Sequence, residues 1–144
     1  MSEGRREILT IRADYALLSE LREFVRVAGS KVGLTEAERD KLVLAIDEAA
    51  TNIITHAAKT HPEAIDCRCT MDDLDQSIVC ELVYDTHDHF DPVRTPKHEE
   101  IQKRVQEFKR GGYGLFLMHT LVDSIEYKRE GNRSVIRLVK RHRE

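Results

Sequence analysis

The segment that most constrains the fold is one long amphipathic helix, predicted over residues 36–59. Thr35 and Glu38 have the spacing of a capping box, in which each side chain accepts a hydrogen bond from the other residue's backbone N–H. The pair His61-Pro62 ends the helix. A helix with one apolar face must bury that face against a second layer of structure. The apolar face consists of Leu42, Ile46, Ala49 and Ile53.

Strands on either side of this helix supply the second layer. Alternation of apolar and polar residues predicts strands over 7–12, 64–71 and 78–84 and a C-terminal hairpin of 124–130 and 134–140. Further helices are expected over about 15–29, capped by Asp14, near 101–108 and over 115–122. We therefore expect one α+β domain over residues 1–144. It is a two-layer sandwich in which helices cover one face of a mixed, mostly antiparallel sheet of about five strands.

Glycine is scarce and unevenly placed. The chain has seven glycines, and none lies between Gly33 and Gly111. A Walker-type phosphate loop needs glycines beside a Lys-Ser/Thr pair, and a dinucleotide-binding turn needs three glycines that open a helix. Neither pattern is present, which excludes these two ways of binding a nucleotide.

Charge and hydropathy limit the classes of partner. The 23 basic and 26 acidic residues give a formal net charge of −3, so no electrostatic argument favours nucleic acid or an anionic membrane surface. No apolar run approaches the roughly 20 residues that a membrane-spanning helix needs. We expect neither direct nucleic-acid binding nor membrane insertion.

The three cysteines, at positions 67, 69 and 80, are odd in number. This favours free thiols in a reducing, cytoplasmic compartment. Cys67 and Cys69 alternate with Ile65 and Met71 on one face of a predicted strand. They are therefore interpreted as part of a packed apolar stripe rather than as a ligand pair.

Three polar features could form a functional site, and the first lies on the long helix. Glu48, Asn52 and His56 recur every four residues and border the apolar face. In such a partly sheltered place a carboxylate can act as a base and an amide oxygen can hold a hard cation. The alternative is an ordinary helix surface on which Asn52 is hydrogen-bonded to solvent.

The other two features follow an apolar strand and precede a helix. Asp85 ends the strand 78–84 and is placed to recognise a hydrogen-bond donor, or else simply begins a turn. The run Gly111-Gly112-Tyr113-Gly114 leads into the helix 115–122, where glycines let the backbone approach a phosphate. The alternative is a hinge between two elements.

In this order the three features resemble the motifs of the GHKL (histidine-kinase-like) ATPase superfamily. The run DEAATNIITHA at 47–57 is similar to the N-box of one branch, the bacterial anti-sigma factor serine-protein kinases. Phe90-Asp91-Pro92 resembles the end of that branch's second box, and residues 112–118 resemble its last glycine box. The resemblance covers nearly the whole chain and implies the same fold.

The resemblance also implies a role for each matching residue. Glu48 would orient or deprotonate the attacking hydroxyl, Asn52 would bind the Mg²⁺ of ATP, and Asp85 would bind the adenine amino group. Gly112, Gly114 and Leu115 would lie beside the nucleotide, and residues 93–110 would form a lid. The implied activity is transfer of the ATP γ-phosphate to a serine of an anti-anti-sigma (STAS-type) partner, sequestration of a sigma factor, or both, by a cytoplasmic homodimer.

The second box departs from the pattern of the branch, which is Asp-x-Gly-x-Gly. Here it reads Asp85-Thr86-His87-Asp88-His89, so imidazoles replace both glycines and the box is degenerate. One alternative is therefore a partner-binding module of the same fold that binds ATP poorly. A more remote alternative is a metal-dependent hydrolase that uses His87, His89 and Asp91, a ligand set suited to Zn²⁺ or Mn²⁺. Such enzymes usually have a further histidine where this chain has Pro92.

Overall fold

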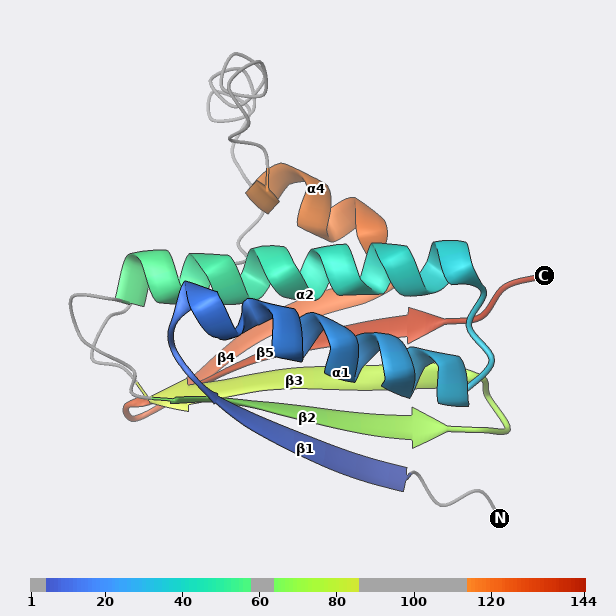
Figure 1. Ribbon diagram of the computed structural model, residues 1–144, viewed down its shortest axis with the longest axis horizontal. Helices are drawn as coiled ribbons and strands as arrows, with labels where there is room; N and C mark the ends of the chain where they lie inside the picture. The colour runs from blue at the N-terminus through green and yellow to red at the C-terminus, as the bar shows by residue number, and fades with distance from the viewer. Residues whose placement is uncertain (1–4, 58–63, 86–113) are drawn as a thin grey trace.

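The computed structural model describes residues 5–57, 64–85 and 114–144, and these form a sheet and a layer of helices (Figure 1). The predicted strands and the three predicted helices within these ranges are confirmed, with ends shifted by a few residues. The helix expected near 101–108 lies outside the described residues. In chain order the elements are β1 (Arg5–Arg12), the 3-10 turn η1 (Tyr15–Leu17), α1 (Leu18–Lys31), α2 (Glu36–Ala57), β2 (Ala64–Asp72), β3 (Ser77–Asp85), α4 (Gly114–Leu121), β4 (Ser124–Glu130) and β5 (Arg133–Arg141).

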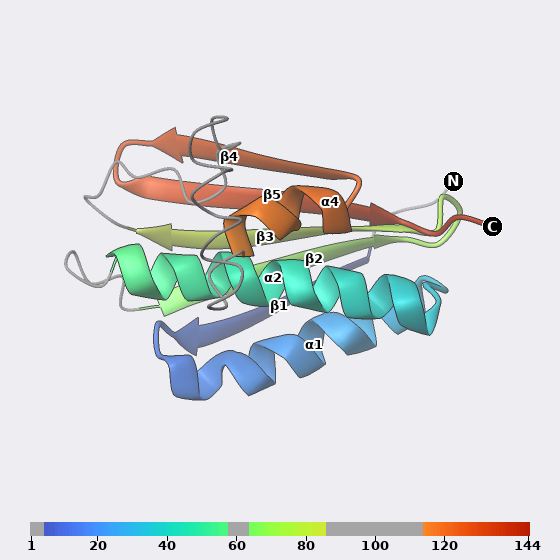
Figure 2. The same cartoon turned by 90° about the horizontal axis from the view of Figure 1, so that it is seen from above.

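The sheet has five strands in the order β1-β2-β3-β5-β4. All four neighbouring pairs are antiparallel. Helices α1, α2 and α4 lie side by side on one face of this sheet, and no described element covers the other face (Figure 2). The expected α+β two-layer sandwich with helices on one face is confirmed. None of the helices among the described residues is long and apolar enough to cross a membrane.

The core fills the space between the two layers. In β2 every second residue is buried, as the alternation of its sequence predicts. The predicted apolar face of α2 packs against this surface, and each of its four residues is at most 1% exposed. The inner side of the sheet contributes Ile65, Cys67, Cys69, Met71, Ile78, Cys80, Leu82, Ile136 and Leu138 to the same cluster.

Local hydrogen bonds begin the helices where the sequence predicts. Asp14 accepts a hydrogen bond from the backbone N–H of Ala16 at 2.9 Å, and the chain makes a 3-10 turn before α1 begins. The capping box of α2 is formed: Glu38 N donates to Thr35 Oγ1 at 3.1 Å, and Thr35 N donates to Glu38 Oε1 at 2.8 Å. These contacts set the direction in which α2 crosses the sheet.

That direction decides where the site features lie. Helix α2 and strand β3 both end at the left of Figure 1, and α4 begins above the C-terminal half of α2. The view in Figure 2 shows the same arrangement from above. The second half of α2 therefore lies between the start of α4, which packs against it, and the layer of the sheet in which β3 ends (Figure 1).

Candidate functional site

Glu48 lies in the second half of α2, at the border of its buried face. The side chain is partly buried, and none of the described residues hydrogen-bonds its carboxylate. Burial raises the pKa of Glu48 above its ordinary value, and the negative charge of Asp47 raises it further. Asp47 itself accepts a hydrogen bond from Arg22 at 2.7 Å. A carboxyl group with a raised pKa, which none of the described cationic side chains contacts, is suited to accept a proton.

Asn52 follows one helical turn later and presents an unsatisfied donor. Its amide nitrogen Nδ2 is buried and has no hydrogen-bond partner among the residues that the structure describes. An unsatisfied buried polar group costs about 1–3 kcal/mol, and native proteins contain few of them. The alternative of an amide that is simply bonded to solvent does not fit this burial. A bound group with oxygen atoms would satisfy the donor.

Asn52 has the chemistry that a nucleotide with a metal ion requires. A primary amide carries two donor hydrogens on nitrogen and an acceptor oxygen, so the same side chain can bond a phosphate oxygen or coordinate a cation. Together with the partly buried Glu48 carboxylate, it forms a pair of polar groups on one side of α2. The residues present therefore fit ATP and Mg²⁺ at this part of the site.

A further hydrogen bond lies near Glu48 and Asn52. The spacing of polar residues in the sequence does not predict it. The hydroxyl of Tyr15 is 2.6 Å from Oγ1 of Thr55, three residues after Asn52. The bond ties η1, at the start of the first helical segment, to the last turns of α2. Only the tertiary structure brings these residues together, and no sequence motif contains both of them.

Asp85 is the last residue of β3 and is exposed. It lies opposite Arg133 of β5 in the register of the sheet. Leu82 and Tyr84 are buried under the helices, so the alternation of the strand puts Asp85 in phase with Glu81, on the open face. Asp85 therefore lies at the expected end of the sheet. Its position in the strand puts it on the open face, whereas the helix that carries Glu48 and Asn52 covers the other face.

The glycine run is described only from its last residue. Gly114 begins α4, which packs against α2, so the free N–H groups of this helix start above the second half of α2. Gly112, the lid residues 93–110 and the histidines of the second box lie outside the described residues. The side chains of His56 and Leu115 also lie outside what the structure describes.

Comparison of the sequence with known protein families assigns the chain to one of them. The family model of the histidine kinase-like ATPase domain matches residues 11–140, which is nearly the whole chain. The chain belongs to the histidine kinase-like ATPase domain family. The superfamily resemblance drawn from the motifs is therefore confirmed. No curated protein matches the chain.

Solved structures show the same fold as this histidine kinase-like ATPase domain. One is the crystal structure of the RsbU and RsbW domains of Rv1364c from Mycobacterium tuberculosis, with a TM-score of 0.64 and 15% sequence identity. The match covers 97% of this chain and 33% of that chain, so the present chain spans about a third of the length of this relative. At this identity the likeness concerns the fold.

The described part of the ATPase domain contains no second candidate for a metal site. No three His, Cys, Asp or Glu residues within it are arranged to hold a metal ion. His87, His89 and Asp91, the ligand set of the hydrolase alternative, lie outside the described residues. That alternative stays a hypothesis from the sequence.

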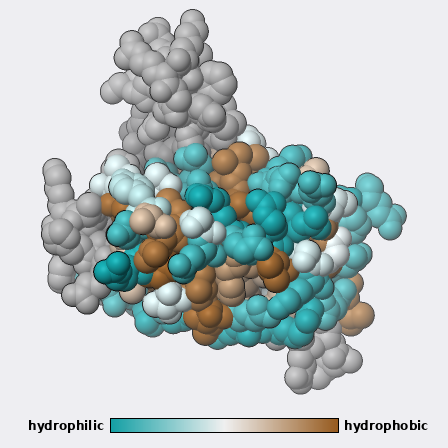
Figure 3. Space-filling model, viewed as in Figure 1, coloured by the Kyte–Doolittle hydropathy of each residue, from teal (hydrophilic) through white to brown (hydrophobic). Residues whose placement is uncertain are grey.

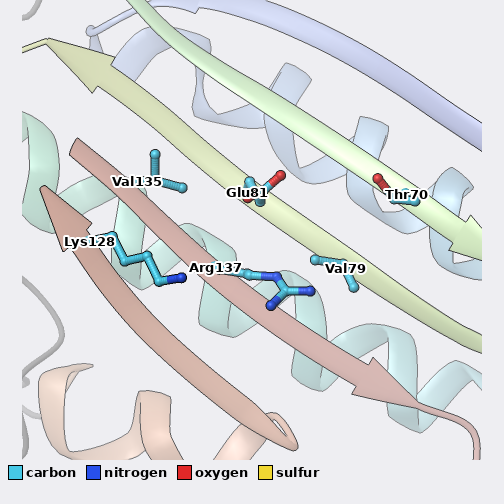
Figure 4. Close-up of a pocket in the computed structure, with 6 residues that line it drawn as sticks. All are labelled: Thr70, Val79, Glu81, Lys128, Val135 and Arg137. Carbon is cyan, nitrogen blue, oxygen red and sulfur yellow. The ribbon is translucent and has the colours of Figure 1, made fainter. Parts of the chain in front are cut away.

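The open face of the sheet carries a separate hollow of ≈ 270 Å³ (Figure 4). Its side chains project away from the helices, which lie behind the strands in this view. The hollow is therefore on the opposite side of the sheet from Glu48 and Asn52. Its lining consists of Thr70, Val79, Glu81, Lys128, Val135 and Arg137.

Proposed function

We propose that this histidine kinase-like ATPase domain is a regulatory protein of the anti-sigma factor type that binds ATP with Mg²⁺. In this proposal it transfers the γ-phosphate to a serine of an anti-anti-sigma (STAS-type) partner, sequesters a sigma factor, or does both. The family membership supports the fold and the nucleotide. The motif of residues 47–57 supports the kinase branch, because it supplies Glu48 and Asn52 in the order and spacing of that branch.

The observation that carries the proposal is the unpartnered amide of Asn52. Its Nδ2 is buried and has no hydrogen-bond partner in the part of the chain that the structure describes, and the stability of the domain would gain from a side chain that avoids this. The Asn52 amide is unfavourable for folding and lies one helical turn from the Glu48 carboxyl, whose pKa is raised. Such a combination is typical of a binding site.

Each proposed residue has one task. Asn52 binds the Mg²⁺ of ATP, and Glu48 orients or deprotonates the serine hydroxyl. Gly112, Gly114 and Leu115 surround the phosphate end, and Asp85, at the end of β3, binds the adenine amino group. Bound ATP and Mg²⁺ supply the phosphoryl group and the positive charge that stabilises its transfer. Positioning and electrostatic complementarity then provide most of the catalysis.

The proposed partners come from the resemblance. The similar solved structure contains an RsbW domain together with an RsbU domain. In that protein the fold therefore occurs together with a second domain. A STAS-type protein, a sigma factor and a second copy of this chain are the partners to test.

The alternative function is a partner-binding module that binds ATP poorly. The observation that favours it is the replacement of both second-box glycines by His87 and His89. The resemblance implies that side chains at these two positions would take space that glycines leave to the backbone and the nucleotide.

Calorimetric titration with Mg²⁺-ATP separates the two functions. We expect saturable heat for the wild-type protein and none for Asn52→Leu. Absence of heat and of any thermal shift with the wild type would establish the binding module instead. Substitution of both histidines, His87→Gly/His89→Gly, should then restore binding.

Phosphoryl transfer needs its own assay with radiolabelled ATP and a purified STAS-type protein. We expect label on the wild-type partner and none on a partner whose phosphorylated serine is changed to alanine. Glu48→Ala should bind ATP about as well as the wild type and transfer no phosphate. Full transfer by Glu48→Ala would refute the role of Glu48 and leave ATP binding intact.

A further inference from the structure

All three cysteines of the chain meet in one cluster in the core. Sγ of Cys69 lies 3.2 Å from Sγ of Cys80 and 3.8 Å from Sγ of Cys67. The three side chains are at most 1% exposed. The sequence predicted that Cys67 and Cys69 belong to an apolar stripe, which is confirmed. The position of Cys80 against them was not predictable from its own strand.

The register of the sheet shows which two thiols are best placed to form a disulfide. Cys69 of β2 and Cys80 of β3 are direct partners in the antiparallel ladder. Such partners have Cα atoms about 4.5–5.5 Å apart, within the range of about 4.4–6.8 Å that disulfides span. Cys67 and Cys69 are two residues apart on one strand, which puts their Cα atoms about 6.6 Å apart, at the limit of that range. A bond between Cys69 and Cys80 therefore requires the least movement of the backbone.

The surroundings activate the central thiol. Hydrogen bonds from Cys67 and from Cys80 lower the pKa of Cys69, although burial opposes the charge. The same contacts raise the pKa values of Cys67 and Cys80. Because the thiolate is the nucleophile in thiol chemistry, Cys69 is the residue that reacts first.

A groove leads towards the cluster between β1 and α1. Its volume is ≈ 540 Å³, and its lining includes Glu7, Leu9 and Phe24. Leu9 and Glu7 are the direct β1 partners of Cys67 and Cys69. Figure 3 shows apolar patches on this side of the molecule, over α1 and its border with the strands. The groove is thus lined by the two β1 residues that pair with Cys67 and Cys69, together with residues of α1 such as Phe24.

We propose that Cys69 and Cys80 form a dithiol site that a hydroperoxide oxidises to a cross-strand disulfide. The Cys69 thiolate attacks one peroxide oxygen and the O–O bond breaks, which gives the sulfenic acid of Cys69 and, for hydrogen peroxide, hydroxide; the proton released when the Cys69 thiol ionised converts this hydroxide to water. The Cys80 sulfur then attacks the sulfenic sulfur, the S–O bond breaks, and a second water leaves with the thiol proton. Two thiols are oxidised and one peroxide is reduced. The site is independent of the proposed ATP chemistry.

The test is a peptide map of the full-length, reduced protein after treatment with hydrogen peroxide. Free thiols are alkylated with iodoacetamide in denaturant before digestion with trypsin. The cleavage sites favour this assay, because peptide 60–68 contains Cys67 alone and peptide 69–94 contains both Cys69 and Cys80. We expect peptide 69–94 without alkyl groups and two hydrogens lighter, peptide 60–68 fully alkylated, and reversal of the change by dithiothreitol.

Two variants make the assignment specific. Cys67→Ala should still form the disulfide, but more slowly than the wild type, because it loses the hydrogen bond from Cys67 that lowers the pKa of Cys69. Cys80→Ala should stop at the sulfenic acid of Cys69, which dimedone labels. Dimedone on Cys67, or a bond that joins peptides 60–68 and 69–94, would overturn the assignment. Three alkylated cysteines in peroxide-treated wild type that keeps its circular dichroism spectrum would overturn the site altogether, and this result requires no variant to fold.

Discussion

Nδ1 of His142 lies 2.9 Å from Oε1 of Glu38, a residue 104 positions earlier in the chain. The Glu38 carboxylate also accepts hydrogen bonds from the backbone N–H groups of Thr35 and Arg143, each at 2.8 Å. Only 15% of the Glu38 side chain and 19% of the His142 side chain is exposed, so solvent screens the contact weakly. The Glu38 carboxylate therefore caps α2 and also binds His142 and Arg143, the residues that follow β5.

Removal of this carboxylate should make the domain less stable, and the effect should depend on pH. Burial opposes ionisation, but hydrogen bonds from His142, Thr35 and Arg143 outweigh it and lower the pKa of Glu38 from 4.5 to about 2. The stabilisation is complete above the unfolded-state pKa and is lost as the pH falls from 4.5 towards 2. We expect Glu38→Gln to lower the free energy of unfolding at pH 7 by about 2 kcal/mol in urea titrations.

Glu36→Gln is the matched control for this prediction. Glu36 lies in the same first turn of α2 but is exposed. The control should change stability by less than about 0.5 kcal/mol. A difference between Glu38→Gln and the wild type that is as large at pH 3 as at pH 7 would contradict the assigned pKa direction.

Asn52→Leu should separate stability from function. The substitution removes a buried amide nitrogen that has no partner among the described residues and replaces it with an apolar group of similar size. We expect an unchanged free energy of unfolding, or an increase of up to about 1 kcal/mol, together with loss of Mg²⁺-ATP binding. Thermal unfolding with and without Mg²⁺-ATP measures both. A large loss of stability in the absence of nucleotide would show that Asn52 has a structural partner instead.

Glu48→Gln should stabilise the domain at neutral pH. Because the pKa of Glu48 is raised in the folded state, the folded protein retains a proton that the unfolded chain has lost. The associated stability is present below the unfolded-state pKa and is lost as the pH rises through the folded-state value. Urea titrations should thus show a more stable variant at pH 7 and equal stabilities at pH 4. A variant less stable than the wild type at pH 7 would contradict the assignment.

Asp47 offers an independent check on Glu48. Its charge is the second cause of the raised Glu48 pKa, after burial. Asp47→Asn should therefore shift the acidic limb of the transfer rate to lower pH without abolishing transfer. Since Asp47 also bonds Arg22, the comparison variant is Arg22→Gln, which breaks that contact and keeps the negative charge.

The bond between Tyr15 and Thr55 should contribute a small coupling energy. Both residues are exposed, and the hydroxyl oxygens are 2.6 Å apart. We expect Tyr15→Phe and Thr55→Val each to lower the free energy of unfolding by about 0.5–1 kcal/mol. The double variant should lose less than the sum of the two. Strict additivity in this double-mutant cycle would show that the two hydroxyls do not interact in solution.

Residues close in sequence specified the layers of this protein. The apolar period of α2 is that of a helix, and the alternation in β2 is that of a strand, so the buried sides of both were predictable. Asp14, Thr35 and Glu38 formed the predicted caps because their partners are at most three residues away. The order along the chain of three features, namely the helix with Glu48 and Asn52, Asp85 after a strand, and the glycine run before a helix, carried the family resemblance.

The tertiary structure decided which distant residues meet. The sequence determined that Asn52 stands at the border of an apolar face, but the burial of its Nδ2 without a partner among the described residues depends on how the layers pack around α2. The contact between Cys69 and Cys80 depends on the register of two strands, and that between Glu38 and His142 on where β5 ends relative to α2. The phase of Asp85 also follows from the observed burial of Tyr84. The periodicity of apolar residues determines which side of a helix or strand is buried. Contacts between residues that are far apart in the sequence depend on how all the elements pack together.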